Sequence, residues 1–318
     1  MGQPGLRPEN PPVERGHPGT NQHGRRRQDP ARQGRLIGLV FATTASATCR
    51  DFFRKLTQNE KVKTLKQTPF LMNISFEIVP RTLEAFEKQY DFVQSLDKAI
   101  NIINVPDIQH FDIRSWELAT RIDPCKYRFI PHFRAIDFKI ESGELYRIIE
   151  QYELDNVLLV TGDPPEGLKR HYSNTNVIDL IRAVRRHFPK LNIYAGFDPH
   201  RQGLQNECNY IQRKADAGVN GFFSQPFYDV RLIEIFAEHM DGLETYIGIS
   251  PVITEASQNY WEVKNHVKFP KNFSPEYDWN IEFANNVIAS AAEKGLNVYF
   301  MPIKADLNKY FQRINLFK

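Results

Sequence analysis

The feature that most constrains the fold of this chain is a regular alternation of short β-rich runs with helical patterns, which starts at residue 74. The runs are apolar and rich in β-branched and aromatic residues, as buried parallel strands are. They predict eight strands, over Ile74–Val79, Ala99–Val105, Tyr127–Phe133, Val157–Thr161, Asn192–Phe197, Gly221–Gln225, Thr245–Ser250 and Val298–Ile303. Strands that alternate with helices favour a parallel sheet covered by helices.

The segments between these runs carry apolar residues at helical spacing. The predicted buried faces are Leu83, Phe86, Tyr90 and Val93; Leu145, Ile148, Ile149 and Tyr152; and Val177, Leu180, Ile181 and Val184. Thr82 and Ser142 stand where N-caps are expected, and Gly218 and Gly295 where left-handed C-caps are expected. Eight βα units within residues 72–318 predict an α/β protein with a TIM (β/α)8 barrel. No Gly-x-Gly-x-x-Gly follows a predicted strand, which argues against a doubly wound dinucleotide-binding sheet.

The net charge of +3 over 318 residues is unevenly distributed. Residues 1–35 hold seven Arg and three acidic residues, so the remainder, with 34 basic and 35 acidic groups, is nearly neutral. A nucleic-acid-binding domain is expected to carry a basic face, and this body shows no such excess. No apolar run approaches the roughly 18 residues of a membrane span. We therefore expect neither nucleic acid nor membrane as a partner.

The first part of the chain has a different composition from the rest. Residues 1–35 contain six Pro and six Gly but few large aliphatic residues, so we predict a disordered or dispensable extension over residues 1–50. A lead-in helix or linker over 51–71 and the barrel over 72–318 would follow, with Met72 as an alternative start. Two targeting alternatives remain: Arg25–Arg27 followed by Leu36–Ala47 resembles a twin-arginine signal, and Arg-rich segments also occur in organelle transit peptides.

Cysteine usage bears on the compartment. Cys49, Cys125 and Cys208 are odd in number and widely spaced, which fits neither a disulfide framework nor a zinc site. We therefore expect a reducing compartment and a cytoplasmic location.

Active sites of such barrels lie at the C-terminal ends of the strands, and three polar residues there are prominent. Glu77 lies within an apolar strand, where burial would raise its pKa and suit it to donate a proton near neutrality; the alternative is a barrel-lining carboxylate paired with a Lys or Arg. Asp163 follows the fourth strand in a Gly-Asp-Pro-Pro turn. Either the turn holds its carboxylate in place for a functional role, or the carboxylate simply caps the turn. Gln225 precedes Pro226 and can both donate and accept hydrogen bonds. A carboxylate with an amide suits the edge of a heterocycle such as a pterin.

Other polar residues gather at the same strand ends, namely Asn104, Asp107, His132, Asp198, His200 and Lys304. His132 and His200 could ligate a metal, but no third ligand stands at a zinc-like spacing. We therefore expect no metal, and a core or cofactor-contacting role for both histidines.

Five segments of the barrel carry a resemblance to a known family. They read SFEIVPR, LLVTGDPPEG, AGFDPH, RKADAGVNGFFSQPFYD and GISPV, in that order. Together they resemble methylenetetrahydrofolate reductase of the bacterial type, in which the catalytic domain stands alone. The resemblance covers about residues 72–310, the whole predicted barrel, and leaves the N-terminal extension outside it.

The resemblance implies a flavin-dependent reduction of 5,10-methylenetetrahydrofolate to 5-methyltetrahydrofolate, in one-carbon metabolism and methionine supply. In the family, NADH or NADPH reduces FAD and leaves, and the folate then takes the hydride in the same site. The five-membered ring of the substrate is not itself a hydride acceptor. Protonation at N10 opens that ring to a 5-iminium cation, which is one, so an acid is required.

The resemblance also assigns roles to individual residues. Glu77 matches the acid, Asp163 the aspartate between flavin and pterin, and Gln225 the glutamine that holds the pterin. Lys304 stands on the substrate side, where the family has a late arginine. The implied FAD contacts are His132, Gly162, Asp163, Tyr172, Phe197, His200, Glu207 and Lys214, with Lys214 as the partner of a phosphate.

The chain departs from the family pattern mainly on the flavin side. Thr161 replaces an arginine before the Gly-Asp pair, Asn104–Asp107 replaces a Thr-containing segment, and Phe197 replaces a tyrosine. Two alternative functions remain open: a folate-binding barrel or partner subunit without its own reductase activity, and an unrelated TIM-barrel lyase or metal hydrolase. Association into a homo-oligomer is also compatible with a barrel of this kind.

Overall fold

The computed structural model describes residues 71–96, 99–108, 111–163, 172–240 and 242–316. The extension predicted over residues 1–50 lies outside these ranges, as does all of the 51–71 segment except its last residue. Cys208 is a free thiol, whereas Cys125 is disulfide-bonded, so the expectation that the cysteines do not pair is wrong at Cys125.

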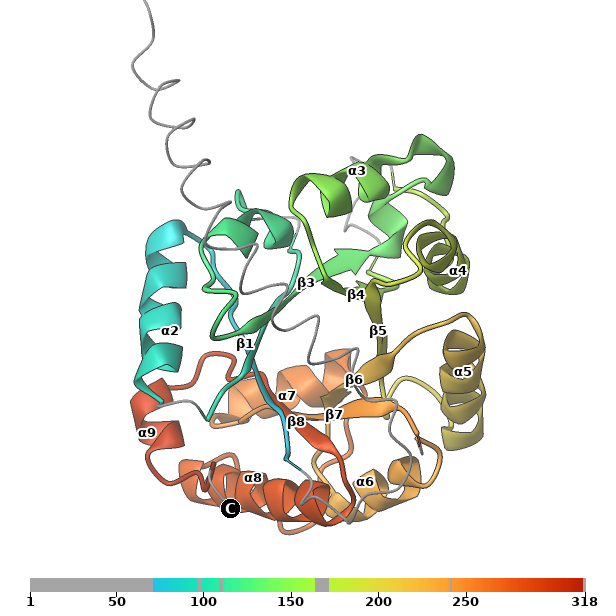
Figure 1. The fold of residues 1–318 in the computed structure, drawn as a ribbon. Coiled ribbons are helices and arrows are strands. Elements are labelled where there is room, and N and C mark those ends of the chain that lie inside the picture. The colour runs from blue at the N-terminus through green and yellow to red at the C-terminus, as the bar shows by residue number, and fades with distance from the viewer. Residues whose placement is uncertain (1–70, 97–98, 109–110, 164–171, 241, 317–318) are drawn as a thin grey trace, which may run out of the picture. The chain divides into compact units, whose positions relative to one another are not determined.

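The described strands form a closed parallel barrel in sequence order, in which β8 pairs back onto β1 (Figure 1). The strands are β1 (Ile74–Glu77), β2 (Ile102–Val105), β3 (Arg128–Arg134), β4 (Asn156–Val160), β5 (Asn192–Phe197), β6 (Gly221–Pro226), β7 (Glu244–Ile249) and β8 (Asn297–Phe300). The predicted TIM barrel is therefore confirmed.

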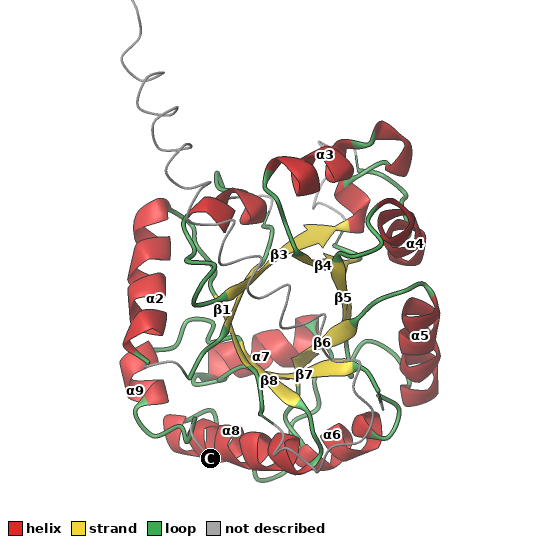
Figure 2. Ribbon diagram, in the orientation of Figure 1, coloured by secondary structure: helices red, strands yellow, loops and turns green. Residues whose placement is uncertain are grey.

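Helices surround the ring of strands (Figure 2). The α-helices are α2 (Leu83–Ser95), α3 (Glu144–Gln151), α4 (Val177–His187), α5 (Leu204–Asp216), α6 (Val230–Ala237), α7 (Glu255–Lys264), α8 (Tyr277–Glu293) and α9 (Leu307–Phe311). Short 3₁₀ helices are η1 (Ser115–Thr120), η2 (Ala135–Asp137) and η3 (Ile140–Ser142). Among the described residues, no helix combines the length and apolar character that a membrane crossing requires.

Capping chemistry at the helix ends follows the sequence. The Thr82 side chain accepts the Ala85 N–H, and Gly218 and Gly295 adopt φ values of 105° and 67°, so these three predictions are confirmed. Phe86, Tyr90 and Val93 face the core as predicted, but Leu83 is 42% exposed. Leu83 opens the first turn of α2, where the helix face has not yet reached the barrel.

Alternate residues of the strands fill the barrel interior, because side chains on a strand point to opposite faces in turn. The interior cluster is Ile102, Ile130, Leu158, Tyr194, Phe223, Tyr246, Tyr299 and Met301. At the N-terminal end of the barrel, Arg128 pairs with Glu244 at 2.7 Å, and Tyr194 and Tyr246 also donate to that carboxylate. This network leaves the opposite, C-terminal end as the mouth at which chemistry can occur.

At the mouth, β1 and β8 end before their predicted ends, whereas β3 and β6 each run one residue beyond theirs. β8 ends at Phe300 instead of Ile303 because Pro302 has no N–H to donate and Lys304 adopts a left-handed φ of 56°. β1 ends at Glu77, two residues before its predicted end. The consequence is that Glu77 is the last residue of its strand and lies at the rim.

Candidate active site

Glu77 is a buried carboxyl group at the mouth, with 8% of its surface exposed. The hydroxyl of Tyr299, on β8, donates a hydrogen bond to Glu77 Oε2. Burial raises the pKa of Glu77 to about 7, against the smaller lowering effect of the Tyr299 hydrogen bond. Within the described ranges, no Lys or Arg lies within ion-pair distance of this carboxylate. The predicted raised pKa is therefore confirmed, and the alternative of a barrel-lining ion pair is not what these residues form.

Tyr299 was not identified from the sequence as a site residue. Its Cα pairs with that of Ser75, which lies two residues before Glu77 on the same face of β1. Tyr299 thus stands one layer below Glu77 in the barrel and reaches up to it, with its ring packed edge-on against Phe223 at 5.1 Å. The sequence gives no sign of this contact, because it depends on the register between the first and last strands, which is set only when the barrel closes.

We predict that Tyr299→Phe raises the pKa of Glu77 further above 7. The lost hydrogen bond stabilises the ionised carboxylate, so its removal keeps the acid form at more alkaline pH. The measurement is the pH titration profile of the Glu77 carboxyl group, followed by difference infrared spectroscopy. Tyr246→Phe is the matched control, because Tyr246 also donates to a barrel glutamate, Glu244, but at the far end. Coincident profiles for wild type and Tyr299→Phe would contradict the prediction.

A second buried polar chain lies beside Glu77 in the barrel. His132 Nε2 lies 3.1 Å from Asn104 Oδ1, and Asn104 Nδ2 donates to Ser75 Oγ at 2.5 Å. Burial lowers the pKa of His132 to about 3, so the imidazole is neutral at physiological pH. Because Asn104 presents its oxygen, Nε2 carries the proton and Nδ1 is left as an acceptor. Asn104 is the register partner of Glu77, which places this chain next to the acid.

The turn after β4 brings Gly162 and Asp163 to the rim. Gly162 has φ 81°, and a Cβ at this position would lie 2.8 Å from Arg134 Nε and 2.9 Å from Arg134 Cβ, so glycine is required twice over. Arg134 donates from its guanidinium to the Asp163 carbonyl at 2.7 Å, while the Asp163 residue is exposed. The prolines predicted to hold Asp163, Pro164 and Pro165, lie outside the described residues.

Gln225 lies on β6 at the mouth, where it is exposed. The pairing of β6 with β7 shifts register between Phe223 and Pro226, a bulge that re-aims the end of the strand. Gly248 makes this possible, because a Cβ there would lie 2.6 Å from the Ser224 carbonyl oxygen. The carbonyl of Pro226, the last residue of β6, accepts from His200 Nε2 at 3.0 Å, which ties the loop after β5 to the end of β6.

Two predicted cofactor residues, on β5 and α5, are buried. Phe197 is 3% exposed and packs among Phe222, Phe227 and Phe236, between the barrel and α6. Glu207 is fully buried and accepts from the Asp198 N–H and from the side chains of Arg201 and Gln202. Their positions therefore assign Phe197 to the core and Glu207 to holding the β5–α5 loop. The contact of either residue with the cofactor stays a prediction.

Lys214, on α5, is also buried, with 3% exposure. Its ammonium donates to the Gly196 carbonyl at 2.5 Å and lies 4.0 Å from the centre of the Tyr210 ring. Burial lowers its pKa to about 7, although the nearby Glu207 acts in the opposite direction. The predicted contact with a phosphate stays a prediction.

The remaining predicted residues lie near the rim on separate loops. Tyr172 is 49% exposed, and Lys304 is exposed in its left-handed turn after β8. Asp107, after β2, is buried and pairs with Arg114 at 2.5 Å. Among the described residues, no group of three or more His, Cys, Asp or Glu is placed to hold a metal ion.

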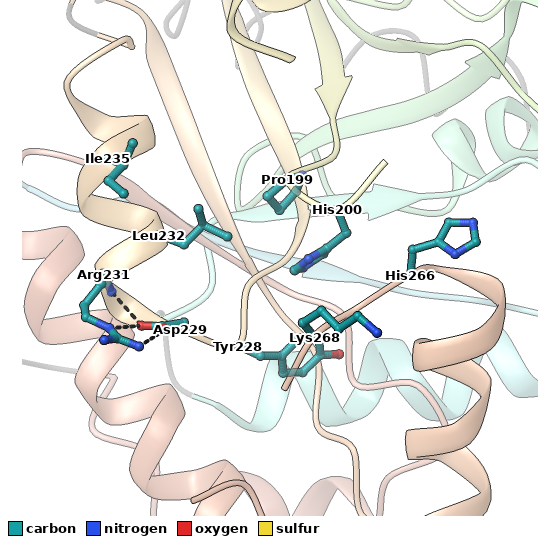
Figure 3. A pocket seen from close by; sticks show the side chains of 9 residues that line it. All are labelled: Pro199, His200, Tyr228, Asp229, Arg231, Leu232, Ile235, His266 and Lys268. Atoms are coloured by element: carbon teal, nitrogen blue, oxygen red, sulfur yellow. Dashed lines mark hydrogen bonds and ion pairs between the residues drawn. The ribbon is translucent and has the colours of Figure 1, made fainter. Parts of the chain in front are cut away.

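A cavity of about 590 Å³ borders the site without containing it (Figure 3). Its lining residues are Pro199, His200, Tyr228, Asp229, Arg231, Leu232, Ile235, His266 and Lys268. Arg231 is held by both oxygens of Asp229, at 3.0 and 2.6 Å. His200 belongs to the strand-end residues as well as to this cavity, whereas Glu77, Asp163 and Gln225 do not line it. These three predicted site residues therefore lie outside the cavity.

Comparison with known proteins identifies the family. A family model described as methylenetetrahydrofolate reductase matches residues 71–288, which contain the buried acid, the Gly-Asp turn and the strand-end glutamine. The chain belongs to this family. Methylenetetrahydrofolate reductases are oxidoreductases that act on a folate, so the chain is an enzyme of that kind. The resemblance drawn from the five sequence segments is thereby confirmed.

Solved structures of other families are similar to this chain at low identity. A 2,3-dimethylmalate lyase of the PEP mutase/isocitrate lyase superfamily is 11% identical, with a TM-score of 0.49 over 75% of this chain and 77% of that one. An oxaloacetate acetylhydrolase with bound oxalate is 9% identical, with a TM-score of 0.47 over 72% and 74%. The spore cortex-lytic enzyme SleL of Bacillus cereus is 8% identical, with a TM-score of 0.46 over 80% and 77%.

Proposed function

We propose that this chain reduces 5,10-methylenetetrahydrofolate to 5-methyltetrahydrofolate, with a bound flavin and with NADH or NADPH as the reductant. The observation that carries the proposal is Glu77, a carboxyl group with a pKa of about 7 at the mouth of a barrel of this family. A group that is half protonated near neutrality suits the protonation that opens the folate ring.

The chain's own residues divide the remaining work. Glu77, held by Tyr299, donates its proton to N10 of the substrate, and the ring opens to the 5-iminium cation. The carboxylate of Asp163 at the rim stabilises that cation electrostatically. Gln225 offers one amide that both donates and accepts, which matches the mixed donor and acceptor edge of a pterin. These roles use residues from β1, the β4 turn and β6, which converge only at the mouth.

The mouth also fits a flavin. Gly162 lets the backbone of the turn pack directly on Arg134, because a Cβ there would lie 2.8 Å from Arg134 Nε. The buried Nε of Arg134 has no hydrogen-bond partner. His132 is neutral and presents Nδ1 as an acceptor, which suits a polar but uncharged contact with a ring system. His132, Gly162 and Asp163 would hold the cofactor, together with Tyr172 at the rim. When bound, the flavin would supply the hydride that the iminium carbon accepts.

A folate-binding barrel without reductase activity is the main alternative. Folate recognition needs hydrogen-bond partners such as Gln225, but it does not need a protonated carboxyl group in a water-poor position. Burying Glu77 opposes ionisation, and its pKa is raised accordingly. Such a cost is typical of a group used in catalysis. This contrast favours the enzyme over the binding module.

The decisive test is the visible absorbance of the purified protein. We expect a bound or readily bound flavin whose absorbance is bleached by NADH or NADPH under anaerobic conditions and restored by methylenetetrahydrofolate. Protein that stays colourless and inactive after incubation with FAD would overturn the proposal. Flavin that is bleached by the nicotinamide but never restored by the folate would leave a flavoprotein of another activity.

A further inference from the structure

Arg134 is a cation placed at the rim that neither the sequence comparison nor the proposed acid chemistry uses. It is the last residue of β3, and its Cα pairs with that of Val160 on β4. Its side chain is 15% exposed and runs across Gly162, so closely that a Cβ on Gly162 would strike it. The guanidinium therefore lies between the ends of β3 and β4, directly under the turn that carries Asp163.

The hydrogen bonding of this guanidinium is incomplete. One terminal nitrogen donates to the Asp163 carbonyl oxygen at 2.7 Å. Nε lies 3.4 Å from Asp137 Oδ2, within ion-pair distance, yet Nε is buried without a hydrogen-bond partner. An arginine side chain has five N–H donors, and a buried donor without an acceptor is costly. Nε is too deeply buried to meet a ligand, but among the described residues only one terminal nitrogen of Arg134 is hydrogen-bonded, which leaves terminal N–H donors for a ligand.

The residue at position 161, at the end of the neighbouring strand β4, bears on the role of Arg134. Thr161 stands where the family pattern has an arginine, one residue after the strand partner of Arg134. The Ile136 N–H also bonds to the Thr161 carbonyl at 3.3 Å, so the ends of β3 and β4 stay side by side at this point. A side chain from position 134 can therefore reach the region that one from position 161 would occupy.

We propose that Arg134 binds the flavin cofactor through an oxygen atom of the cofactor, either a phosphate oxygen or a ring carbonyl, and so replaces in space the arginine that Thr161 lacks in sequence. The inference rests on the proposed function, because it presupposes a flavin at the mouth. It adds a second residue of β3, besides His132, to those proposed to hold the cofactor.

The test is a double-mutant cycle on FAD affinity, measured with the full chain freed of flavin. The variants are Arg134→Thr, Thr161→Arg and the double exchange, and the readout is quenching of FAD fluorescence on titration. We expect Arg134→Thr to weaken FAD binding at least tenfold, and Thr161→Arg to restore most of that loss only in the Arg134→Thr background. Equal effects of Thr161→Arg in both backgrounds, or wild-type affinity in Arg134→Thr, would overturn the inference.

A second variant guards against loss of the fold. Arg134→Gln keeps an N–H donor for the Asp163 carbonyl but removes the charge, and we again expect at least a tenfold loss of affinity. Arg185→Gln is the control, because Arg185 also bonds backbone carbonyls, those of Gly218 and Leu191, away from the mouth. It should lower the melting temperature without changing FAD affinity. An Arg134→Gln protein that binds FAD like wild type would refute the assignment.

Titration with riboflavin, which lacks the phosphates of FAD, shows which kind of cofactor oxygen Arg134 contacts. A loss for FAD that is absent for riboflavin places Arg134 on a phosphate, and an equal loss for both places it on the ring. If wild-type protein binds no flavin at all, the proposed function fails. If wild type binds FAD and every Arg134 variant binds it equally well, only this inference fails.

Discussion

A Glu77→Gln variant should still pass reducing equivalents from NADH or NADPH to the flavin, but it should reduce methylenetetrahydrofolate roughly 10²–10⁴ times more slowly, the usual contribution of general acid catalysis. Gln keeps the size and the hydrogen bond to Tyr299 but has no proton to give to N10. Anaerobic stopped-flow absorbance follows the two half-reactions separately. Glu244→Gln is the matched control, a barrel glutamate bonded to tyrosines at the opposite end, and it should leave both rates unchanged. Folate reduction at the wild-type rate in Glu77→Gln would remove Glu77 from the mechanism.

The raised pKa of Glu77 predicts how the rate of folate reduction depends on pH. The pKa of Glu77 is about 7 in the folded protein against 4.5 for an unperturbed glutamate, so the acid form prevails below pH 7. Folate reduction should therefore decline as the pH rises through 7, while nicotinamide oxidation by the flavin should not follow this titration.

Stability should follow the same titration. Between pH 4.5 and 7 the folded state retains a proton that the unfolded state has lost, so the contribution of Glu77 to stability is fully present below pH 4.5 and is lost as the pH rises through 7. The total is on the order of 3 kcal/mol. Glu77→Gln should then gain stability relative to wild type as the pH increases, which denaturant titrations at pH 5 and pH 8 would measure.

The barrel could be predicted from sequence because its signal is local and repeated. Each β-rich run and each amphipathic helix is encoded within a few residues, and eight repetitions leave few alternative topologies. Val177, Leu180, Ile181 and Val184 illustrate this, since helical spacing alone predicted a face that is fully buried. The position of Glu77 at the mouth followed from the same logic, because strand order fixes which end of a strand is the rim.

What could not be predicted depends on contacts between strands that are distant in sequence. Tyr299 reaches Glu77 across 222 residues, and Arg134 reaches the Gly162 turn from the preceding strand. Phe197 was predicted to contact the cofactor because it stands where the family has a tyrosine, and strand alternation directs its ring outward, into the aromatic cluster under α6. Lys214 likewise has the expected position on α5, yet its ammonium bonds to the backbone. Residue position was predictable in these cases, whereas side-chain direction was not.

The largest structural effect should come from Gly162→Ala. An alanine at φ 81° pays about 1–2 kcal/mol for the left-handed backbone, and its Cβ would lie 2.8–3.0 Å from atoms of Arg134 and Ile136. Overpacking of this kind typically costs a further 1–3 kcal/mol. Gly143→Ala isolates the backbone cost, because Gly143 has a similar φ of 64° with nothing within 4 Å of the added Cβ.

We therefore expect Gly162→Ala to lower the free energy of unfolding by about 2–5 kcal/mol, the sum of the two costs, and Gly143→Ala by only the first of them. Gly162→Ala should also weaken FAD binding, whereas Gly143→Ala should not. The methyl group added at position 162 displaces Arg134 and with it the Asp163 carbonyl that Arg134 holds. Urea denaturation and FAD titration of both variants provide the comparison. Equal destabilisation by the two substitutions would mean that the turn after β4 yields to the methyl group, and that the close packing of Gly162 on Arg134 does not fix the rim.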